Sequence, residues 1–166
     1  ATDVEMIVSA SGYAAKHLTV PAITLGEAAV VDVELELSKA IIVAGGYLED
    51  AHSESIQDLA NQGYNTLVTK RGYDKDTIHY ISFGSADLNG DDIPDDIVDA
   101  EPTNGNLRDA ILNWTGDTKE LFVYMVGHGG IGNFRMSESE YLNISDMDTW
   151  LNTIQENKTC VQNDTC

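Results

Sequence analysis

The spacing of apolar and polar residues differs between the start of the chain and the rest of it. Residues 31–37 alternate strictly between aliphatic and acidic side chains, which is the pattern of a half-solvated strand. Two weaker apolar runs, at residues 4–10 and 16–20, come before it. About three short strands are too few for an independent sandwich. We therefore expect residues 1–37 to be a β-rich segment, either the end of a larger β-sandwich or a sheet added to the next domain.

From residue 38 onward the pattern is typical of an α/β domain. Residues 40–44 form a continuous apolar run that ends at Gly45-Gly46, as in a parallel strand buried on both faces. The other predicted elements are a helix at 53–68, a strand at 77–83, a helix at 106–114, a strand at 120–126 and a helix at 145–154. This alternation predicts a three-layer α/β sandwich with a mainly parallel central sheet. Functional groups in such folds gather in the loops that follow the strands. These loops are 45–50, 82–99 and 127–132.

The charge of the chain limits its partners. Lys and Arg total 9 and Asp and Glu total 28, so the formal net charge is −19. Nucleic acid and anionic membranes would be repelled, whereas divalent cations would be attracted. No apolar run reaches the length of about 18 residues that a bilayer-spanning helix needs, so no membrane insertion is expected. Few lysines, many Asp, Asn and Thr residues and a pair of C-terminal cysteines favour a secreted protein, extracellular or periplasmic.

The loop after the second core strand is the most acidic stretch of the chain. Its candidate calcium ligands are Asp87, Asn89, Asp91, Asp95 and Asp96. Oxygen ligands at alternate positions are what a hard cation needs, and without a cation these carboxylates would repel one another. The loop differs from an EF-hand because Asp92 stands where glycine belongs, and it resembles the short calcium loops of secreted bacterial proteins. We expect a structural calcium ion here; the alternative is a solvated acidic loop without metal.

A histidine follows the last predicted core strand. The apolar run at 120–126 leads into Gly127-His128-Gly129-Gly130, which places His128 at a strand's carboxyl end between glycines that let a substrate approach. His128 is therefore a candidate catalytic residue, although a lone histidine is more often structural. His52, two residues after Asp50 in another strand-end loop, is assigned at most a minor role.

Several segments resemble the caspase-like cysteine peptidases, particularly the legumain-like branch of bacterial secreted proteins. The segment L-F-V-Y-M-V-G-H-G-G is similar to the histidine motif of that family, and A-I-I-V-A-G-G is similar to its first core strand. The resemblance covers roughly residues 39–158. It implies a caspase-like domain at 38–166, either truncated at its C-terminus or degenerate, because the strands of the family's specificity pocket would follow Cys166.

The resemblance also implies a cysteine–histidine mechanism. Cys166 would attack the peptide carbonyl, His128 would activate it, and the amides of Gly129 and Cys166 would form the oxyanion hole. The residues themselves leave other roles open for the two cysteines. Cys160 and Cys166 could pair in a terminal disulfide if their Cβ atoms approach, and an unpaired thiol without a function is the third possibility.

Two functions follow from these patterns. The first is a secreted legumain-like cysteine endopeptidase, or its N-terminal fragment, which acts on polypeptides without an organic cofactor. The second is a non-catalytic, calcium-binding extracellular module on a peptidase-like scaffold, whose partner would be another copy in assembly or adhesion. A hydrolase with a catalytic metal in the acidic loop is a weaker third option, because no histidine joins that loop in the sequence.

Overall fold

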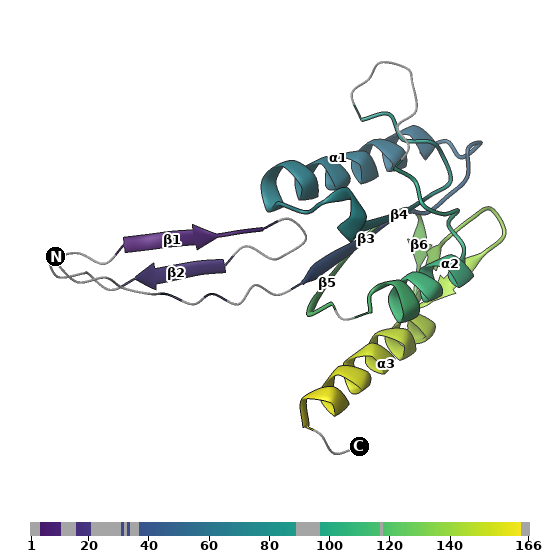
Figure 1. Cartoon of the computed structure of the whole chain (residues 1–166). Helices are drawn as coiled ribbons and strands as arrows, with labels where there is room; N and C mark the ends of the chain where they lie inside the picture. Colours follow the sequence, from purple (N-terminus) through teal and green to yellow (C-terminus); the bar gives the residue numbers. More distant parts are fainter. Residues whose placement is uncertain are drawn as a thin grey trace, which may run out of the picture.

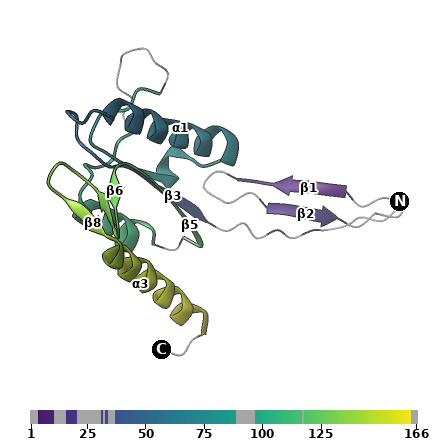
Figure 2. The ribbon, with the colours of Figure 1, turned by 180° about the vertical axis from the view of Figure 1, so that it is seen from behind.

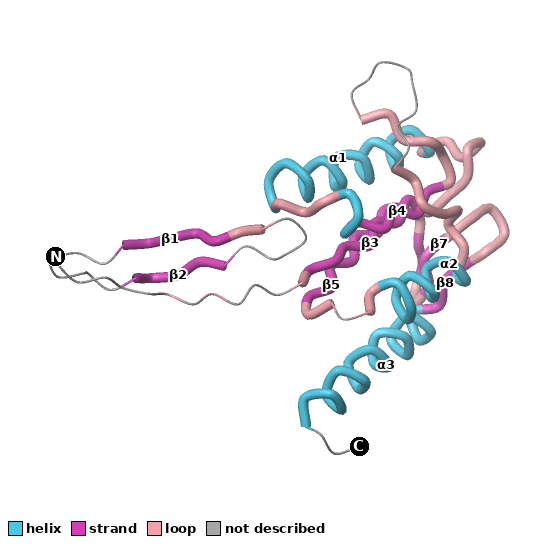
Figure 3. The backbone as a smooth tube through the Cα atoms, in the orientation of Figure 1, coloured by secondary structure: helices cyan, strands magenta, loops and turns pink. Residues whose placement is uncertain are grey.

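The computed structural model describes residues 4–10, 16–20, 31, 33, 37–88, 97–116 and 118–163. Within these residues the chain forms a mixed α/β structure (Figures 1 and 3). It contains a three-stranded parallel sheet, a three-stranded antiparallel sheet and a separate antiparallel strand pair. The predicted alternation of strand and helix after residue 38 is therefore found in the structure.

The parallel sheet is the framework for everything that follows. Its strands are β3 (Ser38–Ala44), β4 (Ile78–Ser82) and β5 (Glu120–Val126). Strand β3 lies in the middle and pairs in parallel with both neighbours. The register places Ala44, the last residue of β3, opposite Ser82 and Val126, which end the other two strands. All three carboxyl ends thus lie level at one end of the sheet.

Helices cover both faces of this sheet (Figures 1 and 2). They are α1 (Ser53–Arg71) on one face, and α2 (Asn104–Asp109), η2 (Ala110–Trp114) and α3 (Ile144–Asn163) on the other. Alternate side chains of β3 explain the arrangement. Ala40, Ile42 and Ala44 belong to the core cluster under α1, whereas Ile41 and Val43 belong to the cluster on the opposite face. All five are fully buried, which is why this strand reads as an uninterrupted apolar run.

Two helices on the second face differ from their predicted form. The helix predicted at 106–114 is divided into α2 and η2, a π-helical turn in which the Thr115 amide bonds the carbonyl of Ala110, five residues earlier, at 3.2 Å. The helix predicted at 145–154 continues to Asn163. The apolar positions that revealed it end at Ile154, which packs on the core, and the polar residues that follow give no periodic signal.

The remaining strands lie outside the parallel sheet. The antiparallel sheet consists of β6 (Gly129–Gly130), β7 (Asn133–Arg135) and β8 (Tyr141–Asn143), and it links β5 to α3. The N-terminal pair consists of β1 (Val4–Val8) and β2 (Lys16–Val20). Of the strand predicted at 31–37, only residues 31, 33 and 37 are described, and residues 31 and 33 are not in a strand. None of the described helices combines the length and the apolar character needed to cross a bilayer.

Candidate functional site

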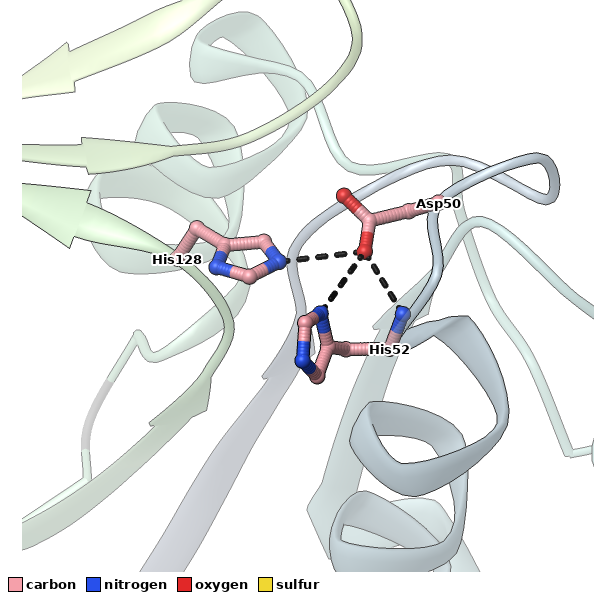
Figure 4. A group of neighbouring side chains, drawn as sticks. All are labelled: Asp50, His52 and His128. Atoms are coloured by element: carbon pink, nitrogen blue, oxygen red, sulfur yellow. Dashed lines mark hydrogen bonds and ion pairs between the residues drawn. The ribbon is translucent and has the colours of Figure 1, made fainter.

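Asp50 and His128 meet at the carboxyl ends of two adjacent strands. Asp50 lies in the loop between β3 and α1, and His128 lies two residues after the end of β5. The Nε2 atom of His128 is 3.1 Å from Oδ1 of Asp50 (Figure 4). The two residues are far apart in the sequence, and the parallel pairing of β3 with β5 brings their loops together.

Glycines allow the two loops to approach this closely. The Gly45 amide donates to the carbonyl of Val126 at 2.8 Å, which continues the ladder beyond the last paired residues. A Cβ atom on Gly127 would lie 2.6 Å from the carbonyl oxygen of Gly45. A Cβ on Gly45 would overlap the backbone of Arg135 and the ring of Phe134. A larger residue at Gly127 would therefore push the ends of β3 and β5 apart, and one at Gly45 would collide with β7.

The two carboxylate oxygens of Asp50 have different partners. Oδ1 accepts a hydrogen bond from the His52 backbone amide at 2.8 Å and lies 3.1 Å from Nε2 of His128. Oδ2 lies 3.8 Å from a guanidinium nitrogen of Arg135. The Asp50 side chain is only 7% exposed, whereas that of His128 is 42% exposed. The carboxylate thus has several partners, while the imidazole keeps a face open to solvent.

These contacts keep Asp50 ionised. The backbone hydrogen bond from His52, followed by that of His128, holds the pKa of Asp50 below its ordinary value against the opposing effect of burial. An ionised carboxylate can only accept hydrogen bonds, so Nε2 of His128 carries the proton in this contact. When the ring is neutral, its other nitrogen, Nδ1, is then unprotonated and can accept a proton from a substrate or nucleophile.

His52 completes a cluster of three side chains. It stands immediately before α1, and its Nδ1 lies 3.6 Å from Oδ1 of Asp50. Its ring meets that of His128 edge to face, with the ring centroids 5.2 Å apart. The ligand atoms of Asp50, His52 and His128 all lie within 4.8 Å of one another. This is a set of donors that could hold a metal ion, in addition to its possible use in proton transfer.

The structure describes only part of the site predicted from the sequence. His128 is at the strand end, as expected, and Gly129 begins β6, where it pairs with Phe134. Cys166 lies outside the described residues, and of Cys160 only the helical backbone in α3 is described. Helix α3 begins beside Gly132, where the Ile144 amide bonds the Gly132 carbonyl at 3.0 Å. From there it leads away from the strand ends (Figures 1 and 2).

Of the predicted calcium ligands, the structure describes Asp87 alone. Asn89, Asp91, Asp95 and Asp96 lie outside the described residues. The far end of the loop is fixed to the sheet, because Oδ2 of Asp99 accepts the Tyr80 amide at 2.7 Å and the Ser82 amide donates to Ala100 at 2.9 Å. The carboxylate of Asp99 is thus used for a backbone contact.

Asp50 is the member of the candidate site that sequence analysis missed. The available signal was its position, because Asp50 and His128 both follow core strands that were predicted to be parallel. The order of strands in the sheet was not predicted, however, and only the adjacency of β3 and β5 makes these two loops neighbours. His52, assigned a minor role, proves to be the third member of the cluster.

Comparisons with protein-family models, with curated proteins and with solved structures found no match to this chain.

Proposed function

We propose that the protein is a secreted cysteine endopeptidase with a caspase-like, legumain-like fold, in which His128 is the general base and Asp50 orients it. The hydrogen bond between Nε2 of His128 and Oδ1 of Asp50 carries this proposal. A mostly buried carboxylate that holds an accessible imidazole at the end of a parallel strand is the base-and-orienter half of a nucleophilic triad. The order of parallel strands and covering helices is compatible with such a fold.

The chemistry requires a thiol next to Nδ1 of His128. Nδ1 would take the proton of the Cys166 thiol, and the thiolate would attack the carbonyl carbon of the peptide bond. The oxyanion formed would be stabilised by backbone amides, those of Gly129 and Cys166. His128 would return the proton to the leaving amine, and water would then hydrolyse the thioester. Asp50 keeps the ring in the tautomer that these steps need.

The mechanism requires Cys166, which follows α3 in the sequence, to lie next to His128. A helix of 20 residues is about 30 Å long, and α3 leads away from His128. Cys166 is only three residues beyond the end of α3, and these residues span at most about 11 Å, so the mechanism requires the C-terminal turns of α3 to unwind. The reactivity of Cys166 is therefore the most informative property to measure, because it reports whether the thiol lies next to His128.

The test compares alkylation of the two cysteines by a thiol-reactive electrophile, read by peptide mass spectrometry. We expect Cys166 to react much faster than Cys160 at neutral pH. His128→Ala should slow labelling of Cys166 by about 100-fold, the usual contribution of a general base. His17→Ala is the matched control, because His17 is an exposed histidine on β2 and should leave the rate unchanged.

Equal rates at both cysteines, unaffected by His128→Ala, would overturn the assignment of Cys166 as nucleophile. A disulfide between Cys160 and Cys166 in the native protein, detected by intact mass before and after reduction, would do the same.

A further inference from the structure

We propose that Asp50, His52 and His128 form a binding site for a zinc ion, with Oδ1 of Asp50, Nδ1 of His52 and Nε2 of His128 as ligands. The three atoms converge from two loops on one point in space (Figure 4). Two imidazoles and one carboxylate are a common ligand set for zinc.

The distances match a coordination tetrahedron along two of its edges. Bonds of about 2.0–2.1 Å from zinc to nitrogen or oxygen place neighbouring ligand atoms about 3.3–3.4 Å apart. Oδ1 of Asp50 lies 3.1 Å from Nε2 of His128 and 3.6 Å from Nδ1 of His52. The third edge, between the two histidine nitrogens, falls within the 4.8 Å span of the cluster. His52 can shorten this edge by rotating its side chain, which is 67% exposed.

The surroundings of Asp50 favour this use of Oδ1. The guanidinium of Arg135 lies 3.8 Å from Oδ2, which orients the carboxylate and leaves Oδ1 toward the histidines. The positive charge of Arg135 also opposes the charge of the metal, so the site should bind more weakly than one with an unpaired carboxylate. The exposed faces of His52 and His128 leave the fourth coordination position to water.

Zinc at this site would also control the proposed reaction, and this consequence rests on the proposed function. A metal on Nε2 of His128 displaces the proton of that nitrogen, so the neutral ring must carry its proton on Nδ1. Nδ1 could then no longer accept the proton of a thiol. Zinc would thus inhibit the peptidase by converting its base to the other tautomer.

The experiment titrates untagged, metal-free protein with zinc against a chromophoric chelator, so that binding is measured without reference to activity. We expect one zinc ion per chain. His52→Ala and His128→Ala should each weaken binding by at least about tenfold, since even the loss of a residue that only orients a ligand has an effect of that size. His17→Ala should bind zinc as the wild type does. Cobalt(II) in place of zinc should give the intense visible absorption of a tetrahedral site.

Nitrogen NMR of His128 provides the second measurement. Zinc should move the ring proton of His128 to Nδ1, and circular dichroism should show that each variant keeps its fold. Zinc binding that is unchanged in His52→Ala would overturn the proposal. Binding that survives both histidine substitutions but is lost in Asp91→Asn/Asp95→Asn would overturn it as well, because the ion would then lie in the acidic loop.

The two proposals fail in different ways. If no cysteine depends on His128 for its reactivity, the peptidase is excluded, yet the zinc titration still decides the metal site. If zinc does not bind the cluster, the labelling experiment still decides the peptidase.

Discussion

The two carboxylate oxygens of Asp50 contact different partners in the candidate site. Oδ2 lies near the guanidinium of Arg135, while Oδ1 accepts hydrogen bonds from the His52 backbone amide and from Nε2 of His128. A single carboxylate therefore fixes both the loop that carries it and the ring that would do the chemistry. Replacing it should disturb the tautomer of His128 before it disturbs the fold.

The first prediction concerns that tautomer. In the metal-free wild type, nitrogen NMR above pH 7.5 should show His128 with its proton on Nε2, because Oδ1 of Asp50 accepts it. In Asp50→Asn the amide can also present a donor, so a mixture of both tautomers is expected. Asp58→Asn, a change on exposed α1 surface, is the control and should leave the spectrum of His128 unaltered. A wild-type ring protonated on Nδ1 would contradict the base assignment.

His79 gives the second prediction at this scale. Its side chain is 19% exposed, it packs 5.2 Å from the ring of Trp114, and burial lowers its pKa although Asp99, 3.8 Å away, acts in the opposite direction. The folded state therefore binds a proton less readily than the unfolded state, whose histidine titrates near pH 6.5. The stability that this residue contributes is complete above that pH and is lost as the pH falls below it.

Urea unfolding between about pH 7.5 and 5 tests this, above the range where most carboxylates titrate. The free energy of unfolding of the wild type should decrease over this range, and His79→Gln should show a smaller decrease. His17→Gln, at an exposed position, should keep the wild-type slope. Identical slopes for all three proteins would show that His79 is not responsible.

At the scale of elements, the sequence predicted best where burial imposes a period. Residues Ala40 to Ala44 of strand β3 are fully buried, with alternate side chains in the cores on the two faces of the sheet. This strand was therefore predicted correctly from its apolar run. The π-helical turn at η2 was not, because its extra residue per turn leaves no distinct mark on the spacing of Leu107, Ile111 and Trp114. Periodicity reports which face is buried and says little about how the backbone turns.

The prediction at the scale of elements concerns the packing of α1 against β5 at Gly63. Gly63 faces β5, and a Cβ atom there would lie 2.8 Å from two ring carbons of Tyr124. Replacing glycine by alanine in a helix normally stabilises it by about 1 kcal/mol. Here the ring would have to move, so Gly63→Ala should instead destabilise the protein by about 1–3 kcal/mol, as overpacking does.

The matched control is Gly105→Ala in α2, where the nearest atom to an added Cβ is the Thr103 hydroxyl at 3.9 Å. This variant should be neutral or more stable. Thermal unfolding of both variants decides the point, and a stabilised Gly63→Ala would mean that α1 and β5 are less closely packed than the structure indicates.

At the scale of the whole molecule, the sequence predicted the position of His128 but not its pairing with Asp50. His128 and the loops at the strand ends were predicted from the chain itself, because an apolar strand followed by glycines is a local signal. The pairing of His128 with Asp50 depends on β3 lying between β4 and β5, and strand order is a property of the assembled sheet. The predicted calcium ligands and Cys166 lie largely outside the described residues, so those assignments remain predictions.

The calcium prediction is tested on the whole protein. Calcium should raise the melting temperature and a chelator should lower it, because an ion that binds only the folded state adds about 2.7 kcal/mol at one hundred times its dissociation constant. Asp91→Asn/Asp95→Asn should remove the effect. Glu138→Gln/Glu156→Gln removes the same charge from exposed positions elsewhere and should retain it.

Sodium chloride at matched ionic strength separates binding from screening of the net charge of −19. A melting temperature that follows ionic strength alone would exclude the calcium site.

The outer edge of β5 has a consequence for how the protein behaves in concentrated solution. Among the described residues no strand pairs with that edge, and Phe122 within β5 is 45% exposed. An edge strand without a partner is a template on which another chain can add, the first step toward fibrils. The surplus of acidic side chains opposes that step by keeping copies apart. The acidity of this chain therefore also serves colloidal stability, and storage near neutral net charge or in strong salt would remove that protection.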